Sequence, residues 1–144
     1  MNTRASGRRK ITTAQLEEHA RENGVYDHFV KFESKALNIF DKKGRTKTGR
    51  TFLATTEYGR QTIMSIFPSD SNEKDGLRYQ VYTQRIADLL MVDSETILSC
   101  FTNTPDIWTG YWESLDDYRG HTGYFTIAYE VDSFFSSLET LKEK

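Results

Sequence analysis

The sequence predicts an α+β protein with a single domain, in which a mainly antiparallel sheet is packed by three to four helices. Three observations favour this fold class. The chain has 144 residues, the size of one ordinary domain. Short β-favouring runs separated by turn residues occupy its middle. Apolar residues recur at helical spacing near its C-terminal end. We therefore expect a flexible basic tail over residues 1–10 and the domain over residues 11–144.

The composition allows a core without disulfides or metal ions. Aromatic residues make up 13% of the chain, and each large ring buries much surface. The formal net charge is only −2, so self-repulsion does not oppose compaction. Cys100 is the only cysteine and lies in an apolar run, which indicates a buried thiol and a reducing, cytoplasmic location.

Two helices are expected at the N-terminal end of the domain. The first begins at Thr13, with acidic residues in its opening turns, and Gly24 ends it. The second is short and covers residues 25–32. An apolar run over 36–40 follows and reads as a strand.

Residues 41–68 predict a hairpin and a central strand. Residues 41–44 read as a turn, and residues 45–56 as a strand with a bulge at Gly49. After a second turn, residues 61–67 are apolar on both faces, which is typical of a central strand covered twice. Pro68 is expected to end that strand and to begin a polar loop that runs to Gly76.

The remaining expected elements are three strands and three helices. We expect strands at 77–81, 108–112 and 122–127, a helix at 83–91, a short helix after Asp93 and a final helix at 129–142. The spacing of apolar and capping residues over 83–98 resembles that of a helix-turn-helix. The second helix of that pair has no Arg, Lys, Asn or Gln for base edges, so two packed structural helices are favoured.

Charge is distributed unevenly along the chain. Residues 1–50 carry twelve Lys and Arg against six Asp and Glu, whereas residues 92–144 carry three against ten. The bases gather in the tail and in the expected hairpin, where flexible cations suit phosphate backbones. The predicted nucleic-acid-binding residues are Arg8, Arg9, Lys10, Lys42, Lys43, Arg45, Lys47 and Arg50. Alternatively, these bases neutralise the acidic C-terminal half or keep the tail soluble, and the pI of about 5.9 favours that alternative.

Aromatic and acidic residues alternate late in the chain. Such a mixture can bind a basic protein partner, because rings supply rigid contacts and acids select charge. The candidate partner-binding residues are Trp108, Trp112, Asp116, Asp117 and Tyr118. The alternative is that every second ring fills the core.

Evidence for catalysis is weaker. One expected loop contains His121, Arg119 and Tyr118. This combination suggests general acid–base catalysis on a phosphodiester. Glu33 and Lys35, with Asp27, resemble half of a metal-dependent nuclease signature. No spacing indicates a metal site or a cofactor, so none is expected.

The sequence thus predicts a non-catalytic binding or regulatory protein that contacts nucleic-acid phosphates through a basic arm and hairpin. One alternative is an acidic-surface inhibitor of a host nucleic-acid-binding system, and another is a small nuclease that uses His121. A protein partner is compatible with each. No apolar run approaches the roughly 18 residues that span a bilayer, so no membrane partner is expected.

Overall fold

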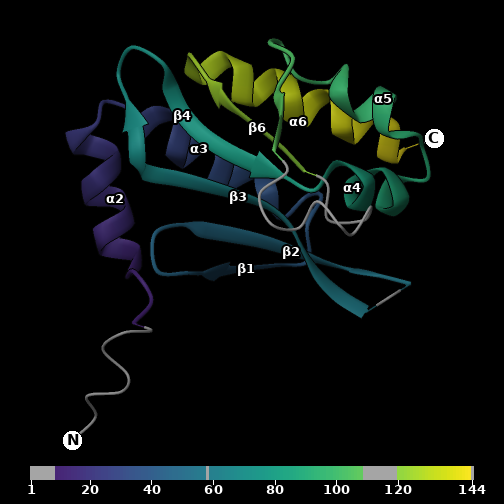
Figure 1. Ribbon diagram of the computed structural model, residues 1–144, viewed down its shortest axis with the longest axis horizontal. Helices are drawn as coiled ribbons and strands as arrows, with labels where there is room; N and C mark the ends of the chain where they lie inside the picture. The colour runs from purple at the N-terminus through teal and green to yellow at the C-terminus, as the bar shows by residue number, and fades with distance from the viewer. Residues whose placement is uncertain (1–8, 58, 109–119, 144) are drawn as a thin grey trace, which may run out of the picture.

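The computed structural model describes residues 9–57, 59–108 and 120–143 (Figure 1). Its helices are α2 (Thr13–Glu22), α3 (Tyr26–Ala36), α4 (Thr83–Leu90), α5 (Ser94–Leu98) and α6 (Ala128–Lys142). Its strands are β1 (Lys42–Arg45), β2 (Arg50–Thr56), β3 (Gly59–Asn72), β4 (Gly76–Val81), β5 (Asp106–Trp108) and β6 (Gly120–Phe125).

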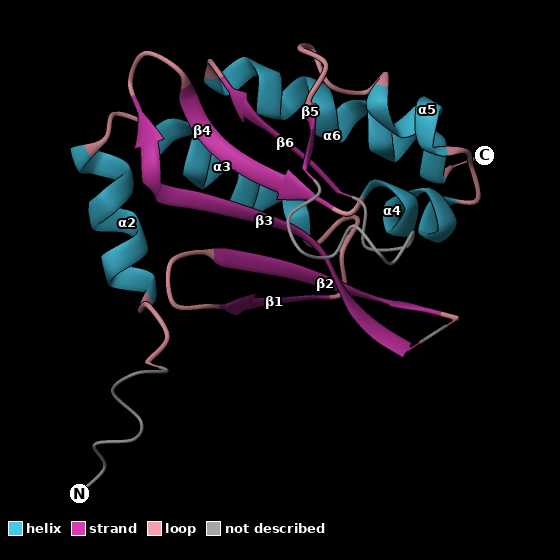
Figure 2. Cartoon of the chain, viewed as in Figure 1, coloured by secondary structure: helices cyan, strands magenta, loops and turns pink. Residues whose placement is uncertain are grey.

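The strands form one antiparallel sheet in the order β1-β2-β3-β4-β6-β5. Figure 2 shows α3 and α6 behind this sheet, while none of the described helices crosses the front of β2, β3 and β4, which we call the open face. The predicted α+β class with a mainly antiparallel sheet is therefore confirmed.

The helical layer begins where the sequence indicates and extends further than predicted. Thr12 and Gln15 form a capping box at the start of α2. Helix α3 continues past Phe32 to Ala36, because Phe29, Phe32 and Ala36 share one buried helical face. The expected strand over 36–40 was wrong, since its first residue closes α3 and the rest forms a turn.

The predicted turn at 41–44 was also wrong. Strand β1 covers Lys42–Arg45, and the turn of the hairpin lies at Thr46–Gly49, where the Thr46 amide donates to the Gly49 carbonyl at 2.9 Å. The bulge falls between Phe52 and Leu53 rather than at Gly49. Gly49 is needed for close packing, because a Cβ there would lie 2.7 Å from Cδ1 of Phe67.

Strand β3 is central, as predicted, because it pairs with both β2 and β4. Its Ile63 and Ile66 side chains are fully buried. Pro68 does not end it. The register with β4 shifts between Phe67 and Asn72, so the missing amide of Pro68 falls where the ladder is irregular, and the strand continues to Asn72. The expected loop shrinks to a turn before Gly76.

The predicted helices α4, α5 and α6 are confirmed. Asp93 accepts a hydrogen bond from the Thr96 amide at 2.8 Å and caps α5, which packs on α4 as a structural pair. Phe134 on α6 stacks on Phe101 with ring centroids 4.5 Å apart. Strand β6 begins two residues before its predicted start, and the expected 108–112 strand enters the described residues only at Trp108, the last residue of β5.

Candidate functional site

The root of the N-terminal arm is hydrogen-bonded to the hairpin turn. The Ile11 amide donates to the Thr46 carbonyl at 2.9 Å, and Nη1 of Arg45 donates to the Ile11 carbonyl at 3.1 Å. Ile11 itself is buried. Arg9 and Lys10 directly precede this junction, and Lys47 directly follows Thr46. The two basic clusters, distant in sequence, therefore meet. We call Arg9, Lys10, Arg45 and Lys47 the basic corner.

The basic corner is accessible. Arg9, Lys10 and Lys47 are exposed, and Arg45 is half-buried. Within the described residues, no salt bridge joins any of these four bases to an acidic side chain. Lys42 is also exposed, at the opposite end of β1 from the turn. Arg8 lies outside the described residues.

Two of the predicted phosphate-binding bases, the buried Arg50 and the exposed Lys43, pair with an acidic side chain of α3 instead. Arg50 is only 4% exposed, and its Nε lies 2.5 Å from Oε2 of Glu33 on α3. Arg50 also donates to Oγ1 of Thr13 at 3.2 Å, and Lys43 pairs with the same Glu33 at 3.0 Å. Their side chains lie on the helix-covered side of β1 and β2, because both contact Glu33 on α3. These contacts fasten the hairpin to the helical layer.

Part of the charge asymmetry is cancelled between α3 and α6. Lys31 lies 3.1 Å from Asp132, and Lys35 lies 3.8 Å from the same carboxylate. These early bases and this late acid neutralise each other, as the alternative interpretation of the charge pattern requires. These salt bridges of Asp132 involve no residue of the basic corner.

The candidate protein-binding residues are only partly covered by the structure. Trp112, Asp116, Asp117 and Tyr118 lie outside the described residues, and Trp108 is placed by its backbone pairing with Gly120. The neighbouring described rings divide between core and surface, with Phe125 buried and Tyr129 70% exposed.

The catalytic candidates do not form an assembled site in the described parts of the chain. His121 lies on β6, with Nδ1 2.6 Å from Oγ1 of Thr83. Arg119 and Tyr118 are outside the described residues. Glu33 and Lys35 pair with different partners, Arg50 and Asp132, so the nuclease-like signature is not brought together with Asp27.

Neither a nucleophilic thiol nor a metal centre is evident. Cys100 is buried, and this burial raises the pKa of its thiol, which favours the unreactive protonated form. Among residues 9–57, 59–108 and 120–143, no cluster of His, Cys, Asp and Glu has the arrangement of a metal site.

Sequence reasoning missed a row of side chains on the open face of the sheet. Phe67 on β3 pairs with Arg78 on β4, and Arg78 pairs with Tyr124 on β6. Directly opposite residues of antiparallel strands point to the same face. That face is the open one, because Leu77 and Tyr79, the neighbours of Arg78, are buried in the core. Only the strand register reveals this row.

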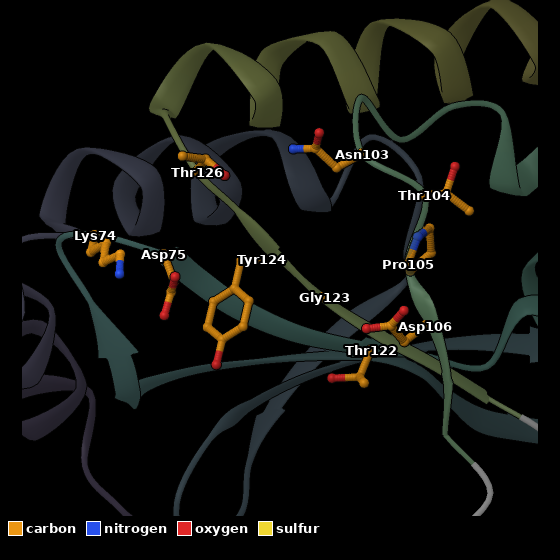
Figure 3. A pocket seen from close by; sticks show the side chains of 10 residues that line it. All are labelled: Lys74, Asp75, Asn103, Thr104, Pro105, Asp106, Thr122, Gly123, Tyr124 and Thr126. Atoms are coloured by element: carbon orange, nitrogen blue, oxygen red, sulfur yellow. The ribbon is translucent and has the colours of Figure 1, made fainter.

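Two hollows border the row. One, of about 460 Å³, is lined by Thr48, Phe67, Ser69, Asp70, Arg78 and Gln80. The other, of about 260 Å³, contains Lys74 and Asp75 on one side of Tyr124 and Thr122 and Asp106 on the other (Figure 3). Arg78 forms an ion pair with Asp70 and lies 5.9 Å from the Phe67 ring centroid.

Among the described helices, none combines the length and hydropathy needed to cross a bilayer. No protein-family model, curated protein or solved structure matches the chain.

Proposed function

We propose that this chain is a non-catalytic nucleic-acid-binding protein that contacts phosphates through the basic corner. One observation carries the proposal: hydrogen bonds between Ile11, Arg45 and Thr46 hold the basic arm and the basic hairpin together. The bases of the arm and those of the hairpin turn thereby form one cationic surface.

Phosphate binding follows from the physics of such a surface. Each Lys or Arg that neutralises a phosphate releases condensed counterions, so log K falls with log salt by about 0.7 to 0.9 per contact. Arg9, Lys10 and Lys47 are exposed and have no acidic partner in the described part of the chain. They therefore keep their charge available for a polyanion.

The interior contacts of the hairpin support the same role indirectly. Arg50 and Lys43 are anchored by Glu33, which fixes the strands that carry Lys47 at the turn between them. Bases fixed by a rigid scaffold lose less entropy on binding than bases on a free coil.

The Lys47→Ala variant tests this proposal. We expect weaker binding to a fluorescein-labelled (dT)10 oligonucleotide and a salt slope smaller by about 1, because one phosphate contact is lost. Fluorescence anisotropy over a series of NaCl concentrations measures both quantities. Combining Lys47→Ala with Arg9→Ala and Lys10→Ala should flatten the slope further.

Lys142→Ala is the matched control, because Lys142 is exposed at the end of α6, an element that contributes nothing to the basic corner. It should bind as the unaltered chain does. An affinity for (dT)10 that changes neither with salt nor with the Lys47 replacement would contradict the proposal. Binding to a basic protein but not to DNA would favour the acidic inhibitor, and cleavage lost in His121→Ala would favour the nuclease.

A further inference from the structure

We infer that the nucleic acid is single-stranded and that its bases stack on Phe67 and Tyr124 across the open face of the sheet. This inference rests on the proposed function and names the class of ligand. It concerns a different set of side chains, which sequence analysis did not identify.

The geometry of the row suits separate bases. Phe67 and Tyr124 stand on strands two apart in the sheet, on either side of Arg78. Neighbouring strands lie about 4.8 Å apart, so the positions of the two rings are separated by about 10 Å. Tyr124 is 37% exposed and lies between Asp75 and Thr122 in Figure 3, and Phe67 is half-buried. This spacing allows each ring to contact a separate base.

The row is continuous with the basic corner. Gly49 packs against the Phe67 ring, and Thr48 lines the same hollow as Phe67. The Ser69 hydroxyl donates to the Thr48 carbonyl at 3.3 Å, which fixes the hairpin turn beside this hollow. Lys47 precedes Thr48, so a phosphate held by Lys47 lies next to the first ring.

The charged side chains favour a position of the nucleic-acid backbone at the margins of the open face. Lys47 precedes Thr48, which lines one hollow, and Lys74 lines the other. Asp75 and Asp106 line the second hollow and repel phosphates there, whereas Asp70 in the first hollow is paired with Arg78. Bases, which are neutral, meet the rings there while the phosphates remain near the two lysines.

The side chains around the rings suit base edges. Ser65, Gln80 and Thr122 form the neighbouring row of the open face and offer hydroxyl and amide groups. Arg78 presents a guanidinium plane, which stacks on bases as aromatic rings do. In a duplex the bases are paired and stacked inside, so only a single strand uses this surface.

Phe67→Leu and Tyr124→Leu test the inference, because leucine keeps apolar bulk and removes the ring. We expect each to weaken (dT)10 binding by about 5- to 150-fold, which corresponds to the roughly 1 to 3 kcal/mol of one base–aromatic stack. Binding to a 10-bp duplex should change by less than about twofold. Tyr129→Leu, which removes an exposed ring on α6, is the matched control and should leave (dT)10 binding unchanged.

Photo-crosslinking of the unaltered chain keeps the test valid if a variant fails to fold. A (dT)10 probe with 5-bromouracil in place of thymine should crosslink to Phe67 or Tyr124, as located by mass spectrometry. Crosslinks confined to other elements would overturn the inference.

Failure of this inference is distinguishable from failure of the proposed function. If the leucine variants bind (dT)10 normally while Lys47→Ala still lowers the salt slope, stacking is wrong and phosphate binding stands. If the unaltered chain has no salt-dependent affinity for (dT)10 or duplex, both are wrong.

Discussion

Glu33→Ala is expected to lower the free energy of unfolding by about 3 to 5 kcal/mol, the usual cost of leaving one partner of a buried ion pair alone. Arg50 is 4% exposed, and Glu33 is the acidic side chain that it contacts, at 2.5 Å. Without that carboxylate, the hydrogen-bond acceptors left to the buried guanidinium among the described residues are the hydroxyl of Thr13 and the carbonyl of Gly44. Lys43 loses its partner as well.

Urea denaturation followed by circular dichroism measures this change. Two variants serve as controls. Glu18→Ala replaces an exposed carboxylate on α2 and should change stability by less than about 0.5 kcal/mol. The double variant Glu33→Leu, Arg50→Met removes both charges and should recover most of the loss. A loss below about 1 kcal/mol in Glu33→Ala would show that the pair does not anchor the hairpin.

Phe32→Ala is expected to cost about 3 to 5 kcal/mol, because it removes a fully buried ring and leaves a cavity. Its ring centroid lies 4.9 Å from that of Phe52 on β2 and 4.8 Å from that of Phe135 on α6. Phe32, which lies on α3, therefore contacts both the sheet and α6. Such a loss is a large share of the 5 to 15 kcal/mol that stabilises a typical domain.

Thermal unfolding provides the measurement for Phe32→Ala, with about 2 to 4 °C lost from the Tm per kcal/mol in a chain of this size. Val30→Ala on the same helix is the comparison, since Val30 is 41% exposed and should change the Tm little. Equal Tm values for the two variants would contradict the placement of Phe32 at the centre of the core.

Elements with a strong local pattern were predictable from the sequence. Helix α6 carries Val131, Phe134, Phe135 and Leu138 on one buried stripe, and no other period fits them. Asp93 was recognisable as a cap because an Asp before a helix can accept a hydrogen bond from an amide of the first turn, here that of Thr96. Strand β4 was likewise clear, with Leu77, Tyr79 and Val81 alternating inward.

Elements stabilised by distant partners were not predictable. Lys42 to Arg45 has low β propensity and became β1 because β2 offers it a pairing edge. Pro68 reads as a strand end, yet β3 passes through it where the register shifts. In both cases tertiary pairing overrides local preference.

The candidate site was only half predictable for the same reason. The sequence identified Lys10 and Lys47 as basic, but not that Ile11 hydrogen-bonds Thr46 and unites their clusters. It did not separate surface from interior bases, because the burial of Arg50 depends on Glu33 from another element. The row of Phe67, Arg78 and Tyr124 depends on strand register and had no signal in the sequence.

The most direct test of the central claim, that arm and hairpin form one binding surface, is a two-dimensional ¹H–¹⁵N NMR titration of the chain with (dT)10. We predict that the amides of Arg9, Lys10 and Lys47 shift along one common binding curve, because a single ligand contacts both segments. Shifts at only one of the two segments, or shifts clustered on α6, would contradict the claim.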